Sequence, residues 1–379
     1  MQEDRVKRIK LAVAAEAVLC MTALAGILCD KWSAAALQEA EATVEEAASR
    51  WVLEAADDGY IKWVDFDVSY KALCCAYDWD VNTWGSEVHI DWIEMLAYFG
   101  ARYGGDFEPH DKSVEKDMAE LARKLLEEHA TMEELTKDMK YYDYYEEAYR
   151  AVLGGLVGEY EIGTADAQGN VSWEKAYGLK AYFPLAKGFD YNHYDDFGTS
   201  RSYGYARQHL GHDMMGQVGV PIIAIESGYV EAIGWNQYGG WRIGIRSFDG
   251  QRYYYYAHMR QNYPYAEGLT EGSVVTAGDV IGYMGHTGYS TEENVNNIET
   301  VHLHWGLELI FDESQKESNN EIWIDVYALT RFLAQHASEA VKVEGTKEWR
   351  RVNQIKDPAV EEYLQTHPLQ TGEVSSGNG

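Results

Sequence analysis

Hydrophobic residues are first concentrated in residues 11–29, a run of 19 residues whose one charged member is Glu16. About 20 apolar residues are enough to cross a bilayer as a helix. Four basic residues lie within positions 5–10, and such a flank predicts that the N-terminal end stays in the cytoplasm. We therefore expect residues 1–30 to form a cytoplasmic stub and a single-pass anchor in the cell membrane, with the remaining chain outside. The alternatives are a cleaved signal peptide, which would release a secreted protein, and a buried helix.

Helical patterns dominate the next part of the chain, residues 31–155. Residues 33–58 are rich in Ala and Glu and contain neither Gly nor Pro, a composition that favours helix and predicts a stalk. Apolar residues then recur every three or four positions between 90 and 99, which is helical spacing. Two more helices are predicted near 114–128 and 143–153. We expect a helical stalk followed by a helical domain, in which we find no catalytic set of residues.

Beyond Gly158 the helical spacing disappears, while glycine, β-branched and aromatic residues become frequent. Residues 241–246 alternate between the two faces of a strand, Asp249-Gly250 is a turn sequence, and residues 252–258 follow as a second strand. This pattern predicts an antiparallel hairpin within a β-rich domain.

We place this β-rich domain at residues 156–336, with a final helix near 324–336. The polar segment 337–379 ends in Ser-Ser-Gly-Asn-Gly and is predicted to be disordered. The fold class expected is therefore multidomain α+β: an N-terminal membrane helix, a helical region, and an antiparallel β-sheet domain with a C-terminal helix.

The charge of the chain limits its partners. With 32 basic and 62 acidic residues, the 379-residue chain carries a net charge of −30. A surface this acidic repels phosphate backbones, which argues against a nucleic-acid partner. The four cysteines include no Cys-x-x-Cys pair, so a zinc ribbon and a thioredoxin motif are both excluded.

Six of the 12 histidines lie between positions 209 and 304. His302 and His304 belong to a predicted strand, where residues i and i+2 share a face, so both imidazoles point the same way. One can then serve as a metal ligand and the other as an acid or base beside it. His209 and Asp213 add a second imidazole and a carboxylate, and Gly211 between them allows a tight turn. Two histidines and one carboxylate with an open fourth position are the catalytic zinc pattern.

Several stretches in this region resemble the lysostaphin-type zinc endopeptidases of bacterial cell-wall metabolism. The resemblance covers about residues 185–330. The matching motifs are Arg207-x-His209-x-Gly211-x-Asp213, Gly219-Val220-Pro221-Ile222-x-Ala224, Gly228-x-Val230, Tyr256-Ala257-His258, Gly272-x-x-Val275-x-Ala277-Gly278-Asp279-x-Ile281-Gly282, Gly285-x-Thr287-Gly288-x-Ser290 and His302-Leu303-His304-Trp305.

The resemblance implies a role for each matching residue. His209, Asp213 and His304 would bind one Zn²⁺ ion, His302 would be the general base for the attacking water, and His258 would stabilise the oxyanion. It also implies a small antiparallel β-sheet fold with a shallow groove, and hydrolysis of peptide bonds in peptidoglycan, in a stem-peptide crosslink or a bridge.

The chain departs from the family pattern at a few positions. His212 stands where an apolar residue is expected, and we assign it to the surroundings of the site rather than to the ligands. Residues 291–301 form a longer loop than in many relatives, which should lie beside the groove. His286 is interpreted as non-catalytic. A residue upstream could block the site in a latent form, and the sequence does not select among Asn192, His193, Asp195 and Asp196.

The sequence therefore favours a membrane-anchored zinc endopeptidase that acts on peptidoglycan. The main alternative is an envelope scaffold protein that uses an inactive or latent peptidase domain to bind a partner or a wall peptide. A carbohydrate-binding module that uses the many Tyr and Trp side chains is a third reading. The sequence identifies no partner for the helical region.

Overall fold

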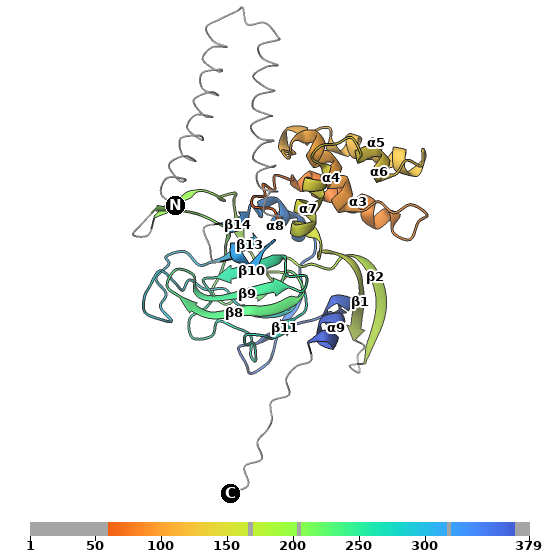
Figure 1. Ribbon diagram of the computed structural model, residues 1–379. Coiled ribbons are helices and arrows are strands. Elements are labelled where there is room, and N and C mark those ends of the chain that lie inside the picture. The colour runs from red at the N-terminus through yellow and green to blue at the C-terminus, as the bar shows by residue number, and fades with distance from the viewer. Residues whose placement is uncertain (1–59, 166–169, 203–205, 317–319, 368–379) are drawn as a thin grey trace, which may run out of the picture. The chain divides into compact units, whose positions relative to one another are not determined.

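The computed structural model describes residues 60–165, 170–202, 206–316 and 320–367 (Figure 1). The predicted membrane segment and the stalk at 33–58 lie outside these residues. Within the described ranges, no helix combines the length and the apolar character that crossing a bilayer requires. Residues 62–379 cluster as one unit, to which the rest of this description applies.

The helical region begins after Ser69, whose side chain accepts a hydrogen bond from the first turn of α3. Asp91 caps α4 in the same way, and Gly104, with φ 70°, ends it. The helices are α3 (Tyr70–Thr83), α4 (Trp92–Tyr103), α5 (Val114–Leu126), α6 (Met132–Thr136) and α7 (Tyr142–Leu153). The helices predicted from the spacing at 90–99, 114–128 and 143–153 are confirmed as α4, α5 and α7.

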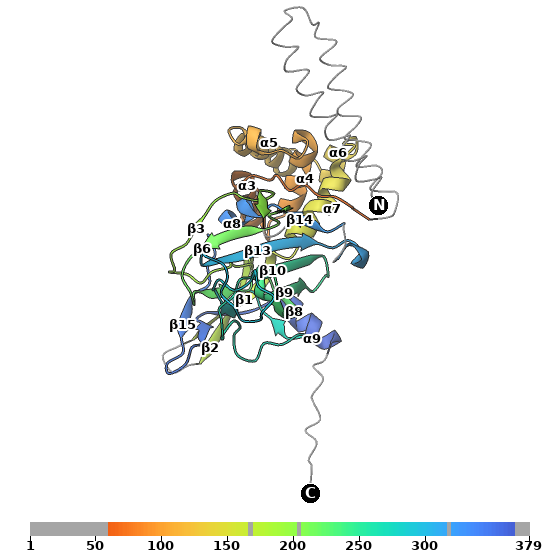
Figure 2. The same ribbon diagram turned by 90° about the vertical axis from the view of Figure 1, so that its left-hand side faces the viewer.

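The β-rich region is built around one antiparallel sheet of eight strands. Along the sheet the order is β11 (Val274–Val275), β8 (Gly228–Asn236), β9 (Gly240–Ser247), β10 (Arg252–Ala257), β13 (His302–Leu309), β6 (His212–Met215) and β3 (Asn192–His193), and β14 (Ile322–Ile324) also pairs with β13. Figure 2 shows β3, β6, β13 and β10 side by side. The predicted hairpin is confirmed as β9 and β10, with Tyr253 opposite Arg246.

The two faces of this sheet differ, as alternation along the strands requires. On β13 the odd-numbered residues Leu303, Trp305 and Leu307 are fully buried and form core. The helix α8 (Tyr327–Leu333) confirms the helix predicted near the end of the domain, and its Phe332 ring packs against Tyr77 of α3 and Trp92 of α4. His302 and His304 lie on the opposite face, so the predicted shared face of the two imidazoles is confirmed.

A buried ionic network joins the helical region to the sheet. The Arg252 guanidinium is 1% exposed, donates from Nε to Glu226 Oε2 at 2.8 Å, and donates from Nη1 to the Ala151 carbonyl at the end of α7 at 2.9 Å. The Tyr254 hydroxyl donates to the same Glu226 oxygen at 2.6 Å. Such a buried charge is tolerated because every partner is hydrogen-bonded.

The predicted disorder of 337–379 is wrong for residues 337–367; residues 368–379 lie outside the description. This segment forms β15 (Ala340–Lys342), β16 (Trp349–Arg351), β17 (Gln354–Lys356) and α9 (Pro358–Thr366). Although the segment is mostly polar, its Ile355 side chain is 6% exposed and packs into a core cluster with Tyr182 and Ile223. This contact helps to fix the segment to the domain. β17 also extends a second sheet formed by β1 (Val157–Ala165) and β2 (Val171–Leu179).

Four shorter strands form two separate two-stranded sheets. Two of them, β7 (Pro221–Ile223) and β12 (Val280–Tyr283), pair with one another, and so do β4 (Ser200–Ser202) and β5 (Ala206–Gln208).

Candidate metal centre

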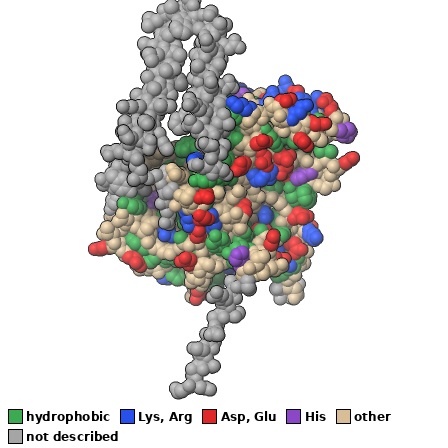
Figure 3. Space-filling view, in the orientation of Figure 1, with side chains coloured by type: hydrophobic (Ala, Val, Ile, Leu, Met, Phe, Trp, Pro, Cys, Tyr) green, Lys and Arg blue, Asp and Glu red, His purple; other side chains and the backbone are tan. Residues whose placement is uncertain are grey.

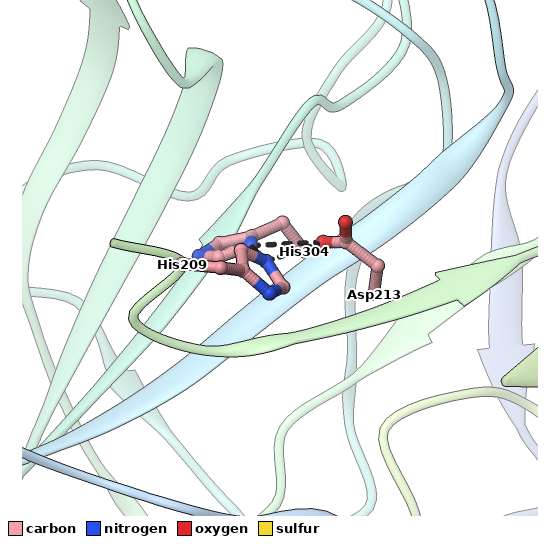
Figure 4. Close-up of side chains that lie close together, drawn as sticks. All are labelled: His209, Asp213 and His304. Atoms are coloured by element: carbon pink, nitrogen blue, oxygen red, sulfur yellow. Dashed lines mark hydrogen bonds and ion pairs between the residues drawn. The ribbon is translucent and has the colours of Figure 1, made fainter. Parts of the chain in front are cut away.

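Three side chains from two distant segments of the chain meet at the sheet (Figure 4). His209 follows β5, while Asp213 on β6 lies directly opposite His304 on β13. The His209 Nε2, Asp213 Oδ1 and His304 Nδ1 atoms are each 3.0 Å from the other two. The predicted convergence of His209, Asp213 and His304 is therefore confirmed.

The donor atoms at this point fit a bound cation. The other ring nitrogen of His209, Nδ1, lies 3.2 Å from the Asp196 carbonyl oxygen, which makes it the protonated nitrogen and leaves a lone pair on Nε2. The Nε2 atom faces a carboxylate oxygen and a second imidazole nitrogen, and these three atoms repel one another unless a proton or a metal cation lies among them. Two imidazoles and one carboxylate are ligands that zinc prefers. Among the described residues, this is the one set of three such groups with donor atoms within 4.8 Å of one another.

The charge states of the three groups are consistent with this. Burial alone would raise the pKa of Asp213, but hydrogen bonds from His209 and His304 outweigh it and hold the pKa well below its usual range. Burial lowers the pKa of His304, which keeps that imidazole neutral. Burial also opposes protonation of His209, but the Asp213 charge is stronger and raises its pKa. The negative field that stabilises a proton here equally favours a metal cation.

Two further histidines face the same space. His302 Nε2 lies 3.7 Å from Asp213 Oδ1, and His302 Nδ1 lies 2.8 Å from the Thr300 carbonyl. His258 Nδ1 lies 3.0 Å from the Thr287 carbonyl, and the His258 and His302 rings are 4.7 Å apart. Since each Nδ1 must donate to its carbonyl, each Nε2 is left with a lone pair. His258 adopts φ 60°, a conformation uncommon for residues other than glycine, which marks a constrained position.

Asp196 and Arg201 were missed as site residues by sequence reasoning. Asp196 is 4% exposed, its Oδ2 lies 3.2 Å from His209 Nδ1, and it forms an ion pair with Arg201. Arg201 Nη2 also donates to Asp213 Oδ2 at 3.1 Å. Asp196 thus contacts and orients His209, and Arg201 does the same for Asp213. The sequence marked Asp196 only as one of four candidates for blocking the site, and the structure instead places its side chain against His209.

The remaining histidines of the region lie beside the site. His212 is buried, contacts His193 through a 2.8 Å ring-nitrogen contact, and burial lowers its pKa to about 3. It is outside the donor set, as expected. His286 Nδ1 lies 2.7 Å from the Ile298 carbonyl and holds the 291–301 loop, where Trp241 Nε1 also donates to Asn294.

An open pocket of about 290 Å³ lies over the three converging side chains. Ile298, Glu299 and Thr300 form part of its wall, which confirms that the long loop stands beside the groove. Aromatic groups form much of the remainder, contributed by Tyr194, Tyr238, Tyr255 and Tyr289.

Comparison with known proteins agrees with this geometry. Residues 207–319 match peptidase family M23. The chain carries an M23 peptidase domain. All five histidine and aspartate residues assigned above to ligand, base and oxyanion roles fall within it.

Two curated relatives illustrate the similarity of the M23 domain. The L-Ala–D-Glu endopeptidase of Bacillus subtilis is 38% identical over 125 residues, which are 33% of this chain and 37% of that protein. Lysostaphin of Staphylococcus simulans is 33% identical over 105 residues, 25% of this chain and 20% of that protein. The chain thus spans well under half the length of both relatives.

Among solved structures, the LytM protein of Ruminococcus gnavus aligns with 74% of this chain and 94% of its own. Its TM-score is 0.47, at 22% sequence identity.

Proposed function

We propose that this protein is a zinc-dependent endopeptidase that hydrolyses peptide bonds in bacterial peptidoglycan. The observation that carries the proposal is the convergence of His209, Asp213 and His304 at the floor of an open pocket, with two more imidazoles facing the same point. The similarity of the M23 domain to proteins named as endopeptidases, one for an L-Ala–D-Glu bond and one for a glycyl-glycine bond, supports it.

The three ligand residues would hold the zinc ion. When bound, zinc supplies Lewis acidity toward the scissile carbonyl and lowers the pKa of a water molecule. The chain provides the proton acceptor in His302, because the Thr300 carbonyl fixes its Nδ1 proton and directs the Nε2 lone pair toward the pocket. General-base catalysis by such a group contributes about 10²–10⁴ in rate.

His258 would stabilise the oxyanion, but its hydrogen bonding shows that it must first be protonated. Its Nδ1 proton is committed to Thr287, and complete burial lowers its pKa well below the ordinary value. A neutral His258 can only accept a hydrogen bond at Nε2. It therefore becomes an oxyanion donor after it has taken up a proton, and His302, 4.7 Å away between ring centres, is the neighbour placed to relay one.

The location of the protein belongs to the same proposal. Residues 1–30, with their basic flank and apolar run, would tether the peptidase to the outer side of the cell membrane, within reach of the wall. The pocket's tyrosines would contact the extended peptide, since such rings offer large apolar area and a polar hydroxyl.

Digestion of purified peptidoglycan, followed by mass spectrometry of the new termini, tests the proposal. The full chain should release peptides with new amino termini, and a chelator or His302→Ala should abolish the release. His367→Ala removes an exposed imidazole just after the helix α9 and serves as the matched control, which should remain active. Peptide release that survives both the chelator and His302→Ala would contradict the assignment.

A further inference from the structure

A second pocket, of about 300 Å³, is unusual for its charge. Three cationic side chains line it, from Arg260, Lys342 and Lys347, and no Asp or Glu is among its lining residues. The chain as a whole carries a net charge of −30. Figure 3 shows Asp and Glu side chains spread over the helical and the β-rich parts of the face drawn there. The electrostatic potential in this pocket is therefore expected to be positive, although the chain as a whole is strongly negative.

The pocket is formed jointly by the M23 domain and the segment that follows it. Arg260 and the stretch 217–220 belong to residues 207–319, whereas Lys342 and Trp349 lie opposite one another in the β15–β16 hairpin. Phe189 completes the wall, and its ring meets the Trp349 ring edge-on with centroids 5.4 Å apart.

The hairpin is fixed to the domain. The Trp349 backbone N–H donates to the Tyr283 hydroxyl at 3.0 Å, and the Ser338 hydroxyl donates to the Gly278 carbonyl at 2.9 Å. Arg351 forms an ion pair of 3.1 Å with Asp279. Because these contacts already hold the hairpin in place, the pocket does not have to be assembled by its ligand, which lowers the cost of binding.

The three cations have no carboxylate of their own. Within the part of the chain that the structure describes, neither Arg260, Lys342 nor Lys347 forms an ion pair. The nearby Glu348 carboxylate accepts hydrogen bonds from the hydroxyls of Tyr263 and Tyr283, at 3.0 Å for Tyr283. The positive charge of the pocket is thus available to a ligand.

This pocket lies close to the catalytic pocket. Met215 and His258 line the catalytic pocket, and Gln217 and Arg260, each two residues further along the same segments, line the cationic pocket. Two residues of chain span at most about 7 Å, whatever their conformation. A peptide lying across the metal centre would therefore reach the cationic pocket within a few residues of the bond that is cleaved.

We propose that this pocket binds a free carboxylate of the wall peptide, a few residues from the scissile bond, and so selects acidic peptides as substrates. The assignment rests on the proposed function. Arg260, Lys342 and Lys347 supply the charge, while the half-buried rings of Phe189 and Trp349 contact the aliphatic part of the acidic residue. Charge complementarity favours this occupant, because a chain of net charge −30 would otherwise repel an acidic peptide.

The test measures binding of the full chain to peptidoglycan from which covalently attached phosphate polymers have been stripped, with a chelator present to prevent turnover. Lys342→Glu/Lys347→Glu should weaken binding about tenfold, since two attractive exposed pairs become repulsive. Arg350→Glu, a single charge reversal on an exposed residue of the same hairpin that does not line the pocket, should leave binding unchanged.

The decisive comparison repeats the measurement on peptidoglycan whose carboxylates have been amidated. There the wild type should bind about as weakly as the double variant, and the two should no longer differ. Equal binding of the double variant and Arg350→Glu to native wall would overturn the proposal, as would a tenfold loss that persists on amidated wall. Carboxylate-dependent binding without any peptide release would leave this inference standing and count against the endopeptidase function alone.

Discussion

Gly211 leaves the space into which the imidazole of His304 fits. A Cβ atom at position 211 would lie 2.6 Å from Cε1 and 2.7 Å from Nε2 of His304, closer than real Cβ contacts come. The Trp305 carbonyl, at 2.8 Å from the same point, closes the other side. Glycine is therefore required at position 211, because any side chain there would collide with His304, the metal ligand on β13.

Gly211→Ala should consequently displace His304 and abolish zinc retention after dialysis. Gly158→Ala provides the control, because a Cβ there meets only the Lys180 side chain, at 3.5 Å, which is ordinary van der Waals contact. Metal content measured by mass spectrometry on both variants decides the matter. A Gly211→Ala protein that keeps its zinc would show that the space is not needed.

Asp196 positions His209, so Asp196→Asn should weaken zinc binding. Loss of a charged partner behind a ligating histidine typically costs about 10–100-fold in metal affinity. Competition with a fluorescent chelator measures that affinity, and the exposed neighbour variant Asp195→Asn should match the wild type. An unchanged zinc affinity for Asp196→Asn would mean that the backbone carbonyl of residue 196 is enough to orient the His209 ring.

His302→Ala should separate catalysis from metal binding. We expect kcat for peptidoglycan cleavage to fall by about 10²–10⁴, since the proton acceptor is removed. Zinc content should stay at the wild-type level, because His302 is outside the donor set. Loss of zinc in this variant would instead place His302 among the ligands.

The raised pKa of Glu308 predicts how the stability of the protein depends on pH. Burial, together with the nearby Glu321 charge, raises its pKa from 4.5 to about 8. The folded protein keeps a proton that the unfolded chain has released, so the free energy of unfolding falls as pH rises from about 4.5 to 8. Glu308→Gln should flatten this dependence in urea unfolding and stabilise the protein at pH 8, whereas the exposed Glu344→Gln should not. An unchanged pH slope for Glu308→Gln would contradict the raised pKa.

The Arg252 network links the helical region to the sheet. Arg252→Met should destabilise the protein by about 3–5 kcal/mol, because it leaves the Glu226 carboxylate buried without its cation. Replacing both residues, as Arg252→Met/Glu226→Leu, should recover much of that loss. If the double variant is no more stable than the single one, packing rather than charge explains the loss.

Local patterns predicted the helices and the hairpin well, because amphipathic spacing in α4 and α5 and the turn at Asp249-Gly250 depend on near neighbours. The ligand set was accessible because His209, Asp213, His302 and His304 lie in short motifs of recognisable type. These signals needed no knowledge of how distant segments pack.

Other features depend on contacts that leave no local pattern. Asp196 meets His209 because backbone hydrogen bonds pair Gly198 and Thr199 with His209. The hairpin of Lys342 and Trp349 looked disordered by composition, and its order comes from side-chain and backbone bonds to residues 278–283. The cationic pocket could not be predicted from local patterns either, because the residues that line it are far apart in the sequence.

The most direct test of the central claim is the zinc content of the purified full chain, measured by mass spectrometry for the wild type and for His304→Ala. The account predicts about one zinc per wild-type chain and almost none in the variant, while His367→Ala keeps one. A wild type that binds no zinc when supplied with it, or a His304→Ala protein that retains a full equivalent, would contradict it.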